Sequence, residues 1–154
     1  MKDRINDDRQ HKETEIRLYR YKTLCMRINS HKHDITELED MNPDALMHSS
    51  KSFVSMIRGG MRIDPTDAYE KQIAMLRAYI SADEYEVRQV RRALRLVRKD
   101  PYYMTIECKY FKRMTDEESG RVLKCSISTL RRNRTRLLRQ ISDALYGMGM
   151  HTPQ

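Results

Sequence analysis

Arginine side chains recur near the end of the chain, between residues 126 and 146. This segment contains five Arg, no Lys and one acidic residue, Asp143. If it folds as a helix, the side chains opposite its apolar stripe are mostly these cations, with Ser and Thr in the first turn. Arg can pair with both major-groove acceptors of guanine and can also bind phosphate. The pattern therefore predicts a helix that lies in the major groove of double-stranded DNA, with a solvated Arg-rich helix as the alternative.

Nine residues are predicted to contact DNA, and they divide into two roles. Those assigned to base edges lie at the start of the segment: Ile127, Ser128, Arg131 and Arg132. Those assigned to phosphates lie further along it or ahead of it: Arg136, Arg139, Thr115, Lys112 and Arg113. The isoleucine is expected to contact a thymine methyl group. A helix that begins at Thr115 would offer its first N–H groups to a phosphate.

Two helix starts are needed to position these residues. Thr115 with Glu118 three residues later is a capping box, and Ser126 is a second N-cap. The first helix is short, whereas the second is expected to run to about Tyr146. Gly120 is expected where the two helices approach most closely. Two helices joined by a short turn, the second bearing the arginines, form the helix-turn-helix arrangement.

The apolar residues of this region are expected to form a small core. Those between the two helices are Leu123, Cys125 and Leu130. Those that continue the stripe onto preceding helices are Leu137, Leu138, Ile141 and Leu145. A further helix is predicted to start at Asp100-Pro101, with Ile106, Tyr110 and Phe111 on its core face. Gly147 and Gly149 are expected to end the last helix.

Two long helices are predicted ahead of this region. Residues 7–41 lack Gly and Pro, and they carry apolar side chains at coiled-coil spacing: Tyr21, Leu24, Ile28, Ile35 and Leu38. Before Tyr21 the pattern weakens, although Ile16 and Tyr19 could still pack. Asp64-Pro65 begins the second long helix. Its apolar residues alternate by three and four, interrupted only by Asp83: Tyr69, Ile73, Leu76, Ile80, Val87, Val90, Leu94 and Val97. A second helix start at Ser81, and hence a kink there, is an alternative.

The fold predicted from these elements is all-α. It consists of a long N-terminal helix (1–41), a linker (42–63), a long basic helix (64–99) and a helix-turn-helix domain (100–149). The two long helices would form a hairpin or a coiled-coil stalk. One side of the second carries six cations, expected to be either a solvated face or a surface for DNA or protein: Arg88, Arg91, Arg92, Arg95, Arg98 and Lys99.

The composition of the chain limits the kinds of molecule that it is expected to bind. The net charge of +8 favours a polyanion, either nucleic acid or an anionic membrane surface. Three Cys without C-x-x-C spacing argue against disulfides and a zinc site, so no metal or cofactor is expected.

No apolar run approaches the roughly 18 residues of a membrane span, and the first residues lack the apolar core of a secretion signal. The expected location is a reducing cytoplasm. No phosphate loop or nucleophile–base pair is found, so the chain is not expected to be an enzyme.

The string TDEESGRVLKCSISTLRRNRTRLLRQI resembles the fourth-region helix-turn-helix of σ factors. The matching positions are Thr115, Glu117, Glu118, Gly120, Leu123, Ser126, Thr129 and Leu130, and the match continues to Leu137, Leu138 and Ile141. Two positions depart from that pattern. Ser119 replaces the usual buried aliphatic residue, which should weaken the small core, and Lys124 stands where Gly often takes the left-handed conformation.

The whole chain resembles phage late-transcription activators of the RinA and ArpU types, from phages and prophages of Gram-positive bacteria. The resemblance covers most of the chain, through the long helices, the Gly-Gly linker and the C-terminal unit. It implies a sequence-specific activator, expected to be a homodimer, that binds upstream of the late promoter and helps to recruit host RNA polymerase. Two alternatives are a small terminase-like packaging subunit and a helical adaptor that acts on polymerase without contacting DNA.

Overall fold

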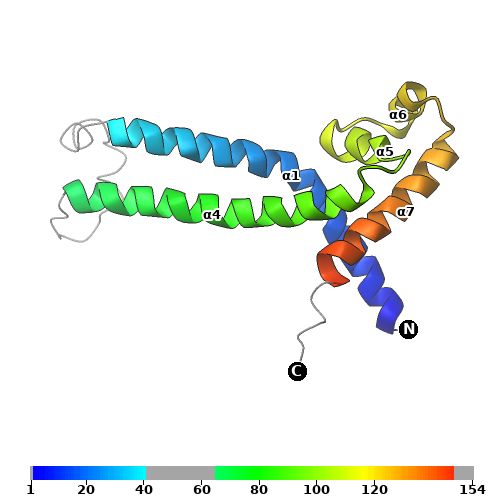
Figure 1. The fold of residues 1–154 in the computed structure, drawn as a ribbon, viewed down its shortest axis with the longest axis horizontal. Helices are drawn as coiled ribbons and strands as arrows, with labels where there is room; N and C mark the ends of the chain where they lie inside the picture. The colour runs from blue at the N-terminus through cyan, green and yellow to red at the C-terminus, as the bar shows by residue number, and fades with distance from the viewer. Residues whose placement is uncertain (1, 41–64, 148–154) are drawn as a thin grey trace. The chain divides into compact units, whose positions relative to one another are not determined.

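The computed structural model describes residues 2–40 and 65–147, with side chains placed for residues 8–40 and 66–147. Every regular element within these residues is a helix (Figure 1). In chain order they are α1 (Lys2–Asp40), α4 (Pro65–Val97), α5 (Met104–Ile106), the π-helical turn η1 (Glu107–Phe111), α6 (Asp116–Leu123) and α7 (Ile127–Tyr146). The predicted all-helical class is confirmed. The predicted linker, 42–63, and Asp64 and Gly149 lie outside the described residues.

The chain divides into two compact units. The first combines residues 1–24 with 85–154, and the second consists of residues 25–84. The division falls within both long helices, so α1 and α4 each contribute to both units. α4 is a single helix from Pro65 to Val97, and Ser81 therefore does not begin a second one.

In the second unit, α1 and α4 pack as an antiparallel pair through apolar side chains that include Ile28 and Leu38 on α1 and Ile73 and Ile80 on α4. These positions belong to the predicted stripes, and all four side chains are buried. Further along the α1 stripe, Ile35 is half-buried. The spacing of the apolar residues thus predicted the contact faces of this hairpin correctly.

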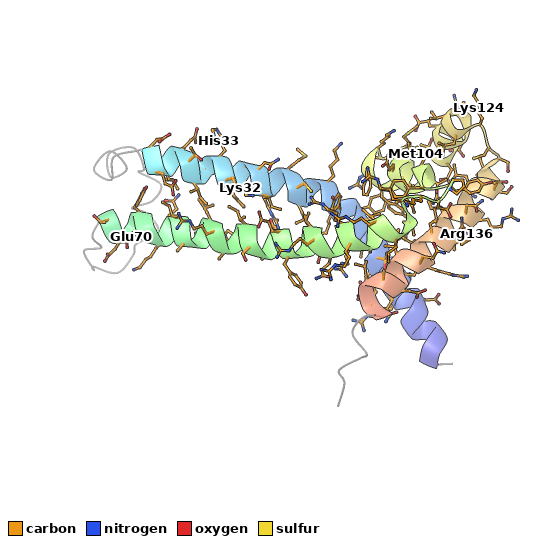
Figure 2. The ribbon with its side chains drawn as sticks, viewed as in Figure 1. Lys32, His33, Glu70, Met104, Lys124 and Arg136 are labelled. Atoms are coloured by element: carbon orange, nitrogen blue, oxygen red, sulfur yellow. The ribbon has the colours of Figure 1, made fainter. Side chains whose placement is uncertain are left out.

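Ion pairs fix the register of the hairpin. Arg27 of α1 donates two hydrogen bonds to Asp83 of α4, one of 2.6 Å. Arg77 of α4 pairs with Glu39 of α1 at 3.1 Å. Lys32 lies on the side of α1 that faces α4 (Figure 2), and its ammonium is 2.7 Å from a carboxylate of that helix. Asp83, which interrupts the apolar stripe in the sequence, is buried because Arg27 supplies its counter-charge.

The first unit has a core to which five of its helical segments contribute. Its buried side chains are Leu18, Val90, Ala93, Leu94, Val97, Ile106, Tyr110, Leu137, Leu138 and Ile141. The prediction for the start of α1 was partly wrong, since Ile16 is 54% exposed and Leu18 is fully buried. Thr14, one turn before Leu18, is also buried, and its hydroxyl donates to the carbonyl of Gln10. This hydrogen bond lets a polar side chain continue the buried stripe.

The helix predicted to start at Asp100 begins later. The Asp100 carboxylate accepts a hydrogen bond from the Tyr102 N–H at 2.9 Å, which forms a turn at this point. α5 starts at Met104 and passes directly into η1. Ile106 and Tyr110 are buried as predicted.

Candidate nucleic-acid interface

α6 starts with the predicted capping box. The Thr115 hydroxyl accepts from the Glu118 N–H at 3.2 Å, and the Glu118 carboxylate accepts from the Thr115 N–H at 2.8 Å. Ser119, buried in the next turn, donates its hydroxyl to the Thr115 carbonyl at 2.7 Å. Its polar atom is therefore satisfied, although it contributes less apolar surface than an aliphatic residue would.

The turn after α6 is tight and depends on the backbone at two positions, Lys124 and Gly120. Lys124 takes the left-handed conformation with φ 50° and ψ 44°, at the position where a Gly would be unstrained (Figure 2). The Cys125 N–H donates to the Gly120 carbonyl at 3.1 Å. A Cβ atom on Gly120 would lie 3.1 Å from the Cys125 carbonyl oxygen and 3.9 Å from the Ile127 side chain. The lack of space at Gly120 is confirmed, but the tight contact is with the backbone of the turn, whereas the α7 side chain lies at ordinary contact distance.

α7 begins at the second predicted cap, where Ser126 accepts a hydrogen bond from the Thr129 N–H at 3.2 Å. It ends at Gly147, which has ordinary right-handed angles. The inner face of α7 carries the fully or almost fully buried Leu130, Leu137, Leu138 and Ile141. This burial fixes the rotation of the helix about its axis.

The outer face of α7 carries the residues that the sequence predicts to be outward. The exposed side chains are Ser128, Arg131, Arg132, Thr135, Arg136 and Arg139. Most of them, with Gln140, line a shallow hollow on this face. A helix with a buried apolar inner face and a cationic outer face is suited to contact a polyanion along its length.

Asp116 at the start of α6 binds two arginines of α7. Its carboxylate accepts from the Arg131 Nε at 2.7 Å and from an Arg134 terminal nitrogen at 2.8 Å. The hydrogen bond from Arg134, aided by that from Arg131, lowers the pKa of Asp116 to about 2. The Arg134 side chain is only 13% exposed, whereas that of Arg131 is 62% exposed. Arg134 thus joins the two helices, and Arg131 projects outward while its Nε is held.

Arg136 is also anchored by an acidic residue, Asp100. It donates to both oxygens of Asp100, at 3.0 and 2.9 Å. Burial disfavours the charged form of Asp100, but the hydrogen bonds from the Tyr102 N–H and from Arg136 outweigh it and lower the pKa of the carboxyl group. In contrast, Arg132 and Arg139 form no ion pair among the described residues. The four exposed arginines of α7 therefore divide into two that are anchored and two that are not.

Three of the remaining predicted residues make contacts with other residues of the chain. Arg113, with φ 58°, donates to the Tyr19 carbonyl at 3.0 Å and stacks its guanidinium 4.3 Å from the centre of the Tyr19 ring. The Thr115 hydroxyl and N–H are both bound to Glu118. Ile127 is half-buried beside Gly120. Lys112 is exposed.

Three residues of this site were not predicted from the sequence: Asp116, Arg134 and Asp100. A capping box accounts for acidic residues in a first turn, so Asp116 gave no separate signal. That α7 places Arg131 and Arg134 beside this carboxylate depends on how α6 packs on α7. Only the three-residue interval between the two arginines, which puts them on one side of a helix, could have suggested a shared partner.

The charge of the chain is concentrated around this site. Residues 85–147 contain sixteen Lys and Arg against seven Asp and Glu, a net charge of +9. Because the whole chain carries +8, the other residues together have a net charge of −1. The positive charge is therefore not a general property of the chain but belongs to the segment that contains α7.

The described part of the chain offers no metal site, since no cluster of three or more His, Cys, Asp or Glu suited to a metal ion occurs there. The three cysteines are free thiols. None of the helices in residues 2–40 and 65–147 has the length and apolar character needed to cross a membrane. In comparisons with known proteins, no family model, no curated protein and no solved structure matches the chain.

Proposed function

We propose that α6, the turn and α7 form a helix-turn-helix unit that binds double-stranded DNA in a sequence-specific manner. The observation that carries this proposal is the outer face of α7. It bears four exposed arginines, and its orientation is fixed by two capped helix starts, the close contact at Gly120 and the buried leucines. A helix that recognises DNA needs a firmly packed inner face together with exposed hydrogen-bond donors on its outer face.

The ion pairs refine the assignment of roles. We assign base contact to Arg132, Arg131 and Ser128, and phosphate contact to Arg136 and Arg139. Asp116 holds one edge of Arg131 and leaves its remaining donors exposed, an arrangement that would fix the direction in which this arginine extends. Arg113 and Thr115 are better explained by their internal contacts, so we no longer assign them to phosphates.

The biological role proposed is activation of phage or prophage late genes. The likeness of the chain to activators of the RinA and ArpU types supports this role. In it, the protein binds upstream of a late promoter as a homodimer and helps to recruit host RNA polymerase in the bacterial cytoplasm. The hairpin of α1 and α4 in the second unit is assigned to dimer or polymerase contact, since residues 25–40 of α1 and 65–84 of α4 lie outside the unit that contains α7.

The test is selection of duplexes from a random pool by the full-length protein, followed by affinity measurements at rising salt. We expect a preferred sequence and a steep decrease of affinity with salt. Arg132→Ala should cost about 1–3 kcal/mol and relax the preference at one base pair, whereas Arg139→Ala should weaken binding to all sequences alike. Arg20→Ala, an exposed arginine of α1, is the control for loss of one charge.

Other outcomes would indicate other functions. Failure to bind any duplex at low salt would contradict the DNA-binding proposal and favour an adaptor that acts on polymerase. A ring of many subunits in light scattering, together with DNA binding, would favour the packaging role over the activator. Equal effects of Arg132→Ala and Arg139→Ala on all sequences would refute the division between base and phosphate contacts.

A further inference from the structure

The part of α4 that belongs to the first unit has a cationic face opposite its core face. Arg88, Arg92 and Arg95 follow one another at intervals of four and three residues, so they lie along one side of α4. Lys99 follows four residues later, in the turn directly after the helix end at Val97. All four are exposed, whereas Val90, Leu94 and Val97 on the other side are buried. We call these four residues the α4 ridge.

Solvation alone is a poor explanation for the α4 ridge. Like charges three and four residues apart destabilise a helix, and solvated helix faces usually alternate cations with acids. No Asp or Glu occurs from residue 87 to residue 99. The helix dipole favours cations at the helix end, which accounts for Arg95 in the last turn and for Lys99 just beyond it, but not for Arg92. Within the described residues, Arg92, Arg95 and Lys99 form no ion pair.

The α4 ridge ends close to the cationic face of α7. Lys99 is followed directly by Asp100, and the Asp100 carboxylate binds Arg136 at 2.9 Å. The end of the ridge thus lies next to the outer face of α7, and both belong to the same compact unit. A polyanion that lies on α7 and extends past Arg136 would meet the ridge at Lys99.

We propose that the α4 ridge binds the phosphate backbone of the same DNA duplex beyond the segment contacted by α7, an inference that rests on the proposed function. From Arg88 to its end at Val97 the helix rises by about 14 Å, over which one DNA strand presents about four phosphates. A row of charges of this length suits a regular polyanion better than a single small anion. Because the contacts are to phosphates, the ridge adds affinity and site length without changing base preference.

The experiment compares the full-length protein with the triple variant Arg92→Gln, Arg95→Gln and Lys99→Gln on a long duplex that contains the preferred sequence. Each phosphate contact contributes about 0.9 to the slope of log affinity against log salt. We expect the slope to become shallower by two to three units. The base preference should stay the same, and a footprint should lose protection on one side. Lys12→Gln, Arg20→Gln and Lys22→Gln, exposed residues of α1, form the control with the same change of charge.

An unchanged slope in the ridge variant, or an equal change in the control, would overturn the inference while leaving DNA binding by α7 in place. Loss of transcription activation with an unchanged slope would also overturn it, because it would assign the ridge to a protein partner. Absence of DNA binding by the unaltered protein would instead refute the proposed function itself. The three single variants, each expected to lower the slope by about one unit, provide the same test if the triple variant does not fold.

Discussion

Replacing Asp116 by Asn tests the ion-pair network that joins α6 to α7. The substitution preserves the size of the side chain and removes its charge. Arg134, with a side chain only 13% exposed, would lose the carboxylate that neutralises it. Arg131 is 62% exposed and would be solvated without a partner. The main cost of the substitution should therefore come from Arg134.

The size of the effect follows from the pKa of Asp116. The hydrogen bonds from Arg134 and Arg131 lower this pKa from 3.8 to about 2. A difference of this size contributes about 2 kcal/mol to the free energy of unfolding at neutral pH. Because the folded pKa lies below the unfolded one, the contribution is complete above about pH 5, falls to roughly half near pH 3 and is lost below about pH 2.

Amide hydrogen exchange of the full-length protein measures this effect at α6 and α7 directly. At pH 7 we expect the protection of their slowest amides to fall by about 30-fold in the Asp116→Asn variant, since 1.4 kcal/mol is a factor of ten. Asp143→Asn is the matched control, because Asp143 is an exposed carboxylate of the same helix α7. Equal losses in the two variants, or a difference from the unaltered protein that grows as the pH is lowered toward 3, would refute the reasoning.

Three further substitutions test the geometry of the same unit. Gly120→Ala should destabilise it by about 1 kcal/mol in urea titrations, because its Cβ would lie 3.1 Å from the backbone oxygen of Cys125. Gly147→Ala, where a Cβ meets nothing within 4 Å, should have no such cost, and similar losses at both glycines would contradict this account. Lys124→Gly should raise the unfolding free energy by about 0.5–1 kcal/mol by relieving the left-handed backbone, and a loss of stability would show that the lysine side chain matters more than its φ angle of 50°. Tyr110→Phe should cost about 1 kcal/mol in the same titrations, because its hydroxyl donates a 2.7 Å hydrogen bond to a Glu carboxylate of α1, and an unchanged midpoint would rule out that contribution.

The starts and the apolar faces of α6 and α7 followed from the sequence alone. Thr115 and Ser126 cap α6 and α7 through hydrogen bonds that span three residues, so the information needed is local. The buried Leu137 and Ile141 follow from helical periodicity in the same way. The left-handed turn at Lys124 was also foreseen, since the resemblance placed a strained position there.

The tertiary structure alone decided which charged side chains of the predicted site are anchored. Arg131 and Arg136 belong to the same exposed face in the sequence pattern, yet each is held by an acid, Asp116 or Asp100, that lies at least fifteen residues away in the chain. Arg113 was predicted to bind phosphate and instead stacks on Tyr19, which is 94 residues distant.

The physical reason is that helix caps and apolar periodicity are properties of a few consecutive residues, whereas an ion pair between helices depends on the rotation and register that packing gives to both. The arginine-rich segment that first indicated DNA binding thus specified by itself that a cationic face would exist on α7. The packing of α6 and of the turn after α4 against α7 decided which of its arginines are held in place, such as Arg131, and which remain unanchored, such as Arg132.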